Sequence, residues 1–287
     1  MSASFESIIH SRLFKFIVGT NAVPIVVHEQ ALADQSTELS TLMQGKMSES
    51  LAGEAIWKDV DEETFIRFTQ FAYTGDYSIP TMIVEASAQD IVNEVERVED
   101  LPLEPEPEPE PAEENGFGWG SYTTPKRKKR ERASALRSVA FNSLTYPLLR
   151  PRSNFADTCD PTISEGSSEN IGEILLIHAS LYVLAEKWGV NSLKMLTLFK
   201  LHRSLSMFQL DGSKVADILK LARYAYSDEN TPDLNTAIDR LRNLVCQYVA
   251  AYAEVISEHP TFIKMIEEGG AFARDLWKCV VPRYLTE

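Results

Sequence analysis

Hydrophobic residues near the start of the chain are spaced as in a short sheet followed by helices. Two runs rich in β-branched and aromatic residues, 14–18 and 23–27, flank a short turn, which predicts a β-hairpin. Between Ala31 and Met43 the apolar residues recur at helical spacing, and Gly45 ends this predicted helix. The first part of the chain therefore mixes strands and helices.

A third strand and a helix with marked ends follow. Residues 54–57 are a candidate strand. Asp61 is a suitable N-cap, and the two glutamates after it favour the positive end of the helix dipole. Gly75 supplies the stop. The apolar face of this predicted helix consists of Phe65, Phe68, Phe71 and Ala72.

From residue 171 onward the pattern is helical throughout. Three helices are predicted: one covers 174–188 and is closed by Gly189, the second begins with Leu193, Leu196 and Phe199, and the third covers 215–226. Each has an apolar stripe that must be buried against other parts of the fold.

Two further helical stretches complete the chain. One is predicted to begin at Thr231 with Pro232 in its first position, and its apolar residues recur at three- and four-residue steps up to Tyr252. The last stretch is split in two by Gly269 and Gly270.

Residues 83–170 interrupt this order with a different composition. Glutamate and proline alternate over residues 104–111, so each proline removes a backbone donor while the glutamates repel one another. The whole stretch offers too little apolar surface to offset the entropy of ordering it. We therefore expect a long disordered insertion, with one short helix near residues 131–141.

Charge and hydropathy exclude several classes of protein. The formal net charge of −14 argues against a nucleic-acid-binding surface spread over the fold, because phosphates need an excess of basic residues. Residues 1–16 lack the uninterrupted apolar core of a signal peptide, and no later stretch approaches the length of a membrane span. We expect a protein that is neither secreted nor membrane-spanning and that resides in the nucleus, the cytoplasm or both.

No group of residues carries a strong catalytic or cofactor signature. Cys159, Cys246 and Cys279 lack metal-ligand spacing and are expected to be ordinary thiols in a reducing compartment. The glycines at 116, 118 and 120 lack the lysine that follows in a phosphate-binding loop. His28, at a strand-to-helix junction, and His178, on an apolar helix face, are expected to have structural roles. The sequence favours a non-enzymatic protein without a cofactor or metal.

One basic run stands out inside the insertion. It consists of Lys126, Arg127, Lys128, Lys129 and Arg130. In a flexible, accessible segment it resembles a monopartite nuclear localisation signal, for which an importin would be the partner. Two alternatives stay open: an intramolecular counter-charge to the Glu-Pro tract, and weak, salt-sensitive contact with about five or six DNA phosphates.

Four strings in the first part of the chain resemble the BTB/POZ family. They are Phe16-Ile17-Val18-Gly19, then Val26-Val27-His28 followed by Leu32 and Ser36, then Gly45-Lys46-Met47-Ser48-Glu49-Ser50, and Phe71-Ala72-Tyr73-Thr74-Gly75-Asp76-Tyr77. After the insertion, residues 179–196 are similar to the next helix pair of the family, with landmarks Tyr182, Ala185, Trp188-Gly189-Val190 and Leu193. The landmark residues of the first part are Gly19, His28, Leu32, Tyr73 and Gly75.

The resemblance implies an α+β BTB/POZ fold, in which a small β-sheet is flanked by a helical cluster. Residues 5–82 and 171–205 would form this domain, and residues 83–170 would be a disordered insertion that splits it. Residues 206–287 would form an all-helical C-terminal extension similar to that of fungal BTB proteins.

The family also implies a function, namely a scaffold that binds protein partners and often homodimerises. Two more specific forms stay open: a substrate adaptor that binds a cullin-type ubiquitin ligase, and a nuclear regulator of transcription with chromatin-associated partners. A fold alone does not choose between them.

One departure from the family bears on dimerisation. Family dimers commonly bury an acidic and a basic residue at positions that correspond to Leu13 and Gln35 here, so a buried ion pair is not formed by this pair. The residues Phe5, Ile8, Ile9 and Leu13 could instead form an apolar dimer face. The sequence leaves homodimerisation open.

Overall fold

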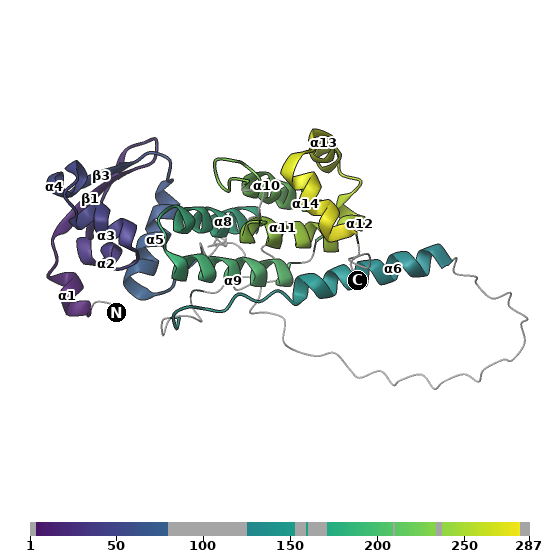
Figure 1. The fold of residues 1–287 in the computed structure, drawn as a ribbon, viewed down its shortest axis with the longest axis horizontal. Coiled ribbons are helices and arrows are strands. Elements are labelled where there is room, and N and C mark those ends of the chain that lie inside the picture. Colours follow the sequence, from purple (N-terminus) through teal and green to yellow (C-terminus); the bar gives the residue numbers. More distant parts are fainter. Residues whose placement is uncertain are drawn as a thin grey trace, which may run out of the picture.

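A computed structural model describes residues 4–79, 125–152, 159, 171–208, 210–233 and 237–281. Within these ranges the protein is rich in α-helix and contains one small mixed sheet, so the α+β class expected from the sequence is confirmed (Figure 1). The sheet and the short helices lie at one end of the molecule, and helices α13 (Pro260–Glu268) and α14 (Gly270–Val280) at the other.

The sheet has three strands in the order β2-β1-β3. Strand β1 (Leu13–Val18) pairs antiparallel with β2 (Val23–His28) and parallel with β3 (Glu54–Trp57), which confirms the predicted hairpin and third strand. Gly19 opens the hairpin turn with a φ of 72°, a conformation that favours glycine. Phe14, Phe16 and Val18 alternate inward and are fully buried.

The helices around the sheet are shorter than the sequence predicts, except for one. The predicted helix of residues 31–43 is divided into α2 (Glu29–Ala33) and α3 (Thr37–Gln44), because the Ser36 side chain accepts a hydrogen bond from the Leu39 N–H at 3.1 Å and starts a new helix. Gly45 ends α3 as expected. The short helices α1 (Phe5–Ile9) and α4 (Ser48–Ala52) were not predicted as helices from the sequence.

Helix α5 (Glu62–Thr74) confirms the predicted helix with both of its ends. Asp61 Oδ1 accepts a hydrogen bond from the Thr64 N–H at 2.8 Å, and Gly75 closes the helix with a φ of 78°. The predicted apolar face is buried against the sheet.

The C-terminal helices confirm the helical pattern, with one error. Helices α8 (Ile171–Lys187), α9 (Asn191–Met207) and α10 (Val215–Ala225) follow the predicted order, and Gly269 separates α13 from α14. The helix expected from Thr231 begins only at Arg240, as α11 (Arg240–Ala251), and is followed by the short α12 (Ala253–Ile256). Asp239 displaces Pro232 as the start signal because its carboxylate accepts hydrogen bonds from the N–H groups of Leu241 and Arg242.

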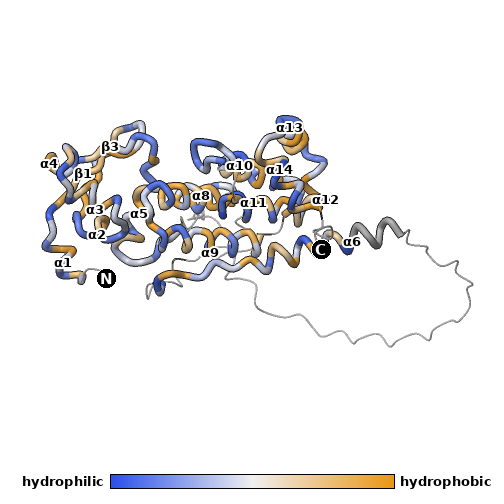
Figure 2. The backbone as a smooth tube through the Cα atoms, viewed as in Figure 1, coloured by the Kyte–Doolittle hydropathy of each residue, from blue (hydrophilic) through white to orange (hydrophobic). Residues whose placement is uncertain are grey.

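Two hydrophobic clusters share helix α8, whose apolar residues are visible in Figure 2. One cluster joins the sheet and α5 to Ile177, Leu181 and Leu184 of α8. The other joins Leu175, Ala179 and Tyr182 of the same helix to α9, α10, α11 and α14. Residues before 79 and after 171 therefore pack around a common apolar interior, although the sequence between them is long.

Part of the predicted insertion packs onto the fold instead of remaining disordered. Helix α6 (Pro125–Asn142) lies beside α11, where the Arg137 Nε–H donates to the Ala250 carbonyl at 2.7 Å and Phe141 is buried. Residues 143–152 then run back along α9 toward α5 (Figure 1). Leu144 and Tyr146 pack against one core and Leu148 against the other. The expected helix near 131–141 is confirmed and is longer, whereas residues 83–124, 153–158 and 160–170 lie outside the described residues.

Within the described ranges, no helix has the length and hydropathy needed to cross a membrane.

Candidate functional site

Two of the landmark residues of the first part, His28 and Tyr73, meet where strand β2 passes into helix α2. The Tyr73 hydroxyl accepts a hydrogen bond from the His28 backbone N–H at 2.8 Å and lies 2.9 Å from His28 Nδ1. Because the hydroxyl already accepts one proton, it can donate its own to Nδ1. Leu32 is fully buried below this contact. His28 thus positions the junction, which is the structural role expected for it.

The four residues of the predicted dimer face do not share one environment. Phe5, Ile9 and Leu13 are exposed, with 73% of Phe5 and 58% of Leu13 accessible to solvent. Ile8 is buried in the core beside the sheet and cannot contribute to a surface. The reason is helical spacing in α1, which turns Ile8 inward between two outward neighbours.

The outer face of the sheet adds two exposed apolar residues that sequence reasoning missed. In β1 the side chains of Leu13 and Lys15 point to the same face, and Lys15 is paired with Val26 in the sheet register. Val26 and Ile56 of this face are 55% and 59% exposed. We define Phe5, Ile9, Leu13, Val26 and Ile56 as the N-terminal apolar surface. The alternation of inward and outward side chains along β2 and β3 could have indicated these two residues, but we used those segments only to predict strands.

Gln35 contacts a cation from a distant part of the chain. Its side-chain N–H donates to the Ala31 carbonyl at 2.8 Å, and its Oε1 accepts from Arg150 Nη1 at 3.1 Å. Leu13 is exposed on the sheet. Neither Leu13 nor Gln35 carries a charge, so these two residues cannot form an ion pair with each other. Arg150, from the segment 143–152, therefore places a positive charge next to the neutral side-chain amide of Gln35.

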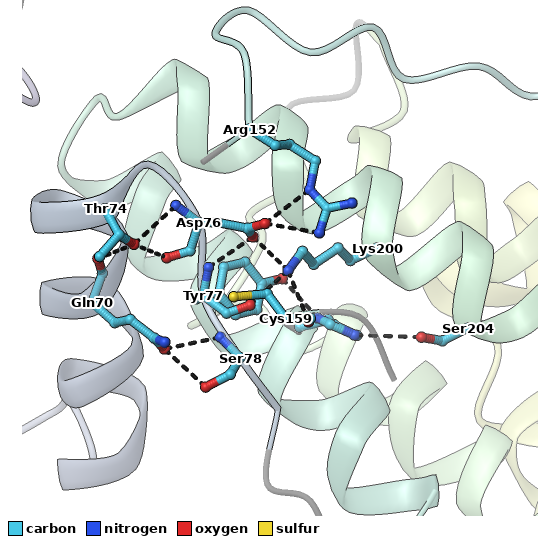
Figure 3. Close-up of polar contacts among 10 residues, drawn as sticks. Gln70, Thr74, Asp76, Tyr77, Ser78, Arg152, Cys159, Lys200 and Ser204 are labelled. Atoms are coloured by element: carbon cyan, nitrogen blue, oxygen red, sulfur yellow. Dashed lines mark hydrogen bonds and ion pairs between the residues drawn. The ribbon is translucent and has the colours of Figure 1, made fainter. Parts of the chain in front are cut away.

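A buried polar cluster joins three segments of the chain (Figure 3). Asp76, directly after α5, lies 2.5 Å from Lys200 Nζ on α9, and both side chains are fully buried. Arg152, in the described part of the insertion, donates to Asp76 Oδ2 through Nε at 2.9 Å and lies 2.8 Å from it through Nη2. We call Asp76, Lys200 and Arg152 the buried clasp.

Backbone groups complete the clasp. The Lys200 ammonium donates to the carbonyls of Tyr77 at 2.6 Å and of Cys159 at 3.2 Å, and Asp76 Oδ1 accepts from the Tyr77 N–H at 2.8 Å. A buried charge is tolerated when it is both paired and hydrogen-bonded. The clasp therefore links the end of α5, the insertion and α9 in one place.

His178 extends the polar network into the core without access to solvent. Its Nδ1 lies 2.7 Å from the Tyr77 hydroxyl and its Nε2 lies 3.4 Å from Ser204 Oγ. His178 is fully buried and Ser204 nearly so, and these residues line neither of the two best-formed cavities in the described part of the chain. The serine and the histidine thus belong to a hydrogen-bonded core network, as expected for His178, and both side chains are shielded from solvent.

His202 connects α9 to the ordered part of the insertion and is sensitive to protonation. Its Nε2 lies 3.1 Å from the Phe141 carbonyl, and its ring packs against Phe141 and Tyr146. Burial lowers the pKa of His202 below its ordinary value of 6.5. Since the folded protein disfavours the charged ring, the stability that neutral His202 contributes is fully present above pH 6.5 and is lost as the pH falls through the folded pKa.

This shift gives a testable pH dependence. His202→Gln should cost more free energy of unfolding at pH 7.5 than at pH 5, because acid already weakens the contribution of His202 in the unmodified protein. Urea unfolding followed by circular dichroism at both pH values measures the two costs. An equal cost at pH 7.5 and pH 5 would contradict the assignment.

The basic run, residues 126–130, forms the first turns of α6, whereas we expected it in a flexible segment.

Among the described residues, no cluster of His, Cys, Asp or Glu has the arrangement of a metal site.

No protein-family model matches this chain, and no curated protein matches it with significant similarity.

Proposed function

We propose that this chain is a protein-binding scaffold of the BTB/POZ type that associates with itself or with protein partners through the N-terminal apolar surface. The observation that carries the proposal is the exposure of five apolar residues at the end of the molecule that holds α1 and the sheet. The four BTB-like strings fall on the hairpin, on α2, at the start of α4 and at the end of α5, which is consistent with the order of elements in that family.

Physical chemistry supports a binding role for this surface. Single exposed apolar side chains are normal on soluble proteins, but a group of them is typical of interaction sites. Here Leu13, Val26 and Ile56 share the outer face of the sheet, and Phe5 and Ile9 are on the neighbouring helix α1. Strands β2 and β3 are both edge strands of the sheet, so their backbones offer further pairing groups. A partner could thus bury apolar side chains and extend the sheet at the same time.

The interior gives this surface a rigid support. Directly beneath the outer face, Phe16, Trp57 and Phe65 form edge-to-face and tilted ring contacts at centroid distances of 4.9 to 5.6 Å. A preorganised surface loses less entropy on binding than a mobile one.

The proposal predicts the effect of charge on the surface. Phe5→Asp combined with Leu13→Asp should weaken self-association by at least about tenfold, because two carboxylates would have to lose water in an apolar contact. Sedimentation velocity over a range of protein concentrations measures the Kd. The matched control is Val255→Asp with Ile263→Asp, which places the same charges on exposed apolar residues of the helical end.

The outcomes separate self-association from partner binding. If the unmodified protein is monomeric at every concentration, the same two double variants are compared by the proteins that co-purify with them. Loss of partners from the Phe5/Leu13 variant alone supports the surface. Equal recovery of partners and equal self-association in both variants would rule it out.

A further inference from the structure

A groove of about 590 Å³ lies between the sheet end and the helical end of the molecule. The hairpin turn from Gly19 to Asn21 and residues 58–64 form one wall. Tyr224 of α10, Asn230 and residues of α8 also line the groove. Grooves of this size at the junction of two parts of a fold are the usual place for ligands.

The groove is lined by both apolar residues and carboxylates. Val23, Leu176 and Tyr224, each partly exposed, supply its apolar surface. Among the described lining residues, its rim of five carboxylates, from Asp59, Asp61, Glu62, Glu63 and Glu173, stands against one cation, Lys58. Such a surface suits long cationic side chains, whose methylene stems pack on apolar atoms while their charged ends reach carboxylates.

Three of the five carboxylates already have duties within the fold. Asp61 caps α5, Asp59 is paired with Lys187, and Glu63 is paired with Arg67 at 3.0 Å. Glu62 and Glu173 are exposed and take part in none of the ion pairs between described residues. These two can therefore bind an incoming cation without breaking an ion pair within the described part of the chain.

The negative potential of the groove also shows in Tyr224. Burial, together with the negative charge of Asp61, raises the pKa of Tyr224 to about 12. The five carboxylates that line the groove disfavour further negative charge, and hence phosphate-rich ligands such as nucleic acid.

The chain itself carries a segment with the complementary chemistry. Residues 126–130 are five consecutive cations in the first turns of α6. The second half of α6 is fixed to the helical end by Arg137 and Phe141, and Figure 1 shows the first turns of α6 directed away from the sheet and α10. The backbone of the run thus points away from the elements that line the groove of its own chain.

We propose that the acidic groove between the hairpin turn and α10 binds the basic run, residues 126–130, of a second copy of this chain. Groove and run are different surfaces, so the contact is head-to-tail and can continue from molecule to molecule. It is independent of the N-terminal apolar surface. Salt screens the groove contact and leaves an apolar contact intact, so the two kinds of association are distinguishable.

A peptide experiment tests the groove. The probe is a fluorescein-labelled peptide of residues 124–132, and the receptor is the full chain with all five residues 126–130 changed to glutamine, so that its own run cannot compete. Fluorescence anisotropy should show saturable binding that weakens by more than about tenfold between roughly 50 mM and 500 mM NaCl. Glu62→Gln with Glu173→Gln in the receptor should weaken binding by about three- to tenfold.

The control separates the groove from net charge. Glu258→Gln with Glu267→Gln removes the same two charges from exposed positions near and on α13 and should leave peptide binding unchanged. An equal loss in the two receptor variants would overturn the proposal in favour of nonspecific attraction. Absence of binding at low salt would overturn it as well.

The whole chain provides the second readout. In light scattering at low salt, the average mass of the unmodified protein should rise with concentration beyond that of a dimer, and the Glu62/Glu173 variant should lose this rise. If the variant associates as the unmodified chain does, the groove is not the contact. The variant with Phe5→Asp and Leu13→Asp should keep the salt-sensitive component of self-association. Failure of one proposal therefore leaves the other one testable.

Discussion

Asp76→Ala should lower the free energy of unfolding by about 3–5 kcal/mol, the typical cost of removing one partner from a buried ion pair. Lys200 and Asp76 have no exposed side-chain surface, so the ammonium would keep its two carbonyl acceptors but lose its contact with the Asp76 carboxylate. The guanidinium of Arg152 and the Lys200 ammonium would then lose the carboxylate that they now share. Urea unfolding followed by circular dichroism measures the change.

Two comparisons show whether unpaired charge is the cause. Glu268→Gln breaks the exposed pair with Arg223 and should cost no more than about 1 kcal/mol. Asp76→Asn combined with Lys200→Met removes both charges and should be more stable than Asp76→Ala. If Asp76→Ala costs less than about 1 kcal/mol, the buried clasp does not hold the three segments together.

Trp57→Ala should destabilise the protein by about 3–5 kcal/mol, as large-to-small changes of buried aromatic residues do. Trp57 is 5% exposed and stacks on Trp188 with ring centroids 4.6 Å apart. Because Trp57 ends β3 and Trp188 follows α8, this contact joins residues on the two sides of the long intervening stretch. Chemical denaturation measures the loss.

An exposed tryptophan provides the matched control. Trp277 on α14 is 69% exposed, and Trp277→Ala should change stability by no more than about 0.5 kcal/mol. A double-mutant cycle of Trp57→Ala and Trp188→Ala should give a coupling of about 0.5–3 kcal/mol. Additive effects in that cycle would mean that the two sides do not share a core.

Elements with local signals were predictable from the sequence. The hairpin, β3 and α5 carry strand composition, an N-cap at Asp61 and a stop at Gly75, and all of these are properties of neighbouring residues. The start of α11 was placed wrongly because Thr231 and Pro232 are a good local signal. The carboxylate of Asp239 competes with them and is the cap in the structure.

The clasp could not be predicted, because its members are far apart in the chain. Asp76 and Lys200 are charged residues, which by default belong on the surface. A hint was available at Lys200, which follows Leu196 at helical spacing and falls on the buried face of α9. Without the position of Asp76, this hint does not identify a partner.

Apart from the short helix near residues 131–141, disorder was predicted for residues 125–152, which are folded, because of the average composition of the insertion. The Glu-Pro tract and the basic run dominate the average over residues 83–170, and they conceal the later apolar residues that pack on the fold. These include Phe141, Leu144, Tyr146 and Leu148. The exposure of Val26 and Ile56 on the sheet was missed because a strand pattern does not reveal which face is covered.

Helix α8 has a thermodynamic consequence that reaches beyond its own contacts. Opposite sides of α8 pack in the two hydrophobic clusters. Unfolding of either the sheet end or the helical end would therefore expose apolar side chains of the other. A single cooperative transition should therefore describe heat denaturation. Any molecule that binds at the sheet end will also protect the distant C-terminal helices, with no need for a change of shape.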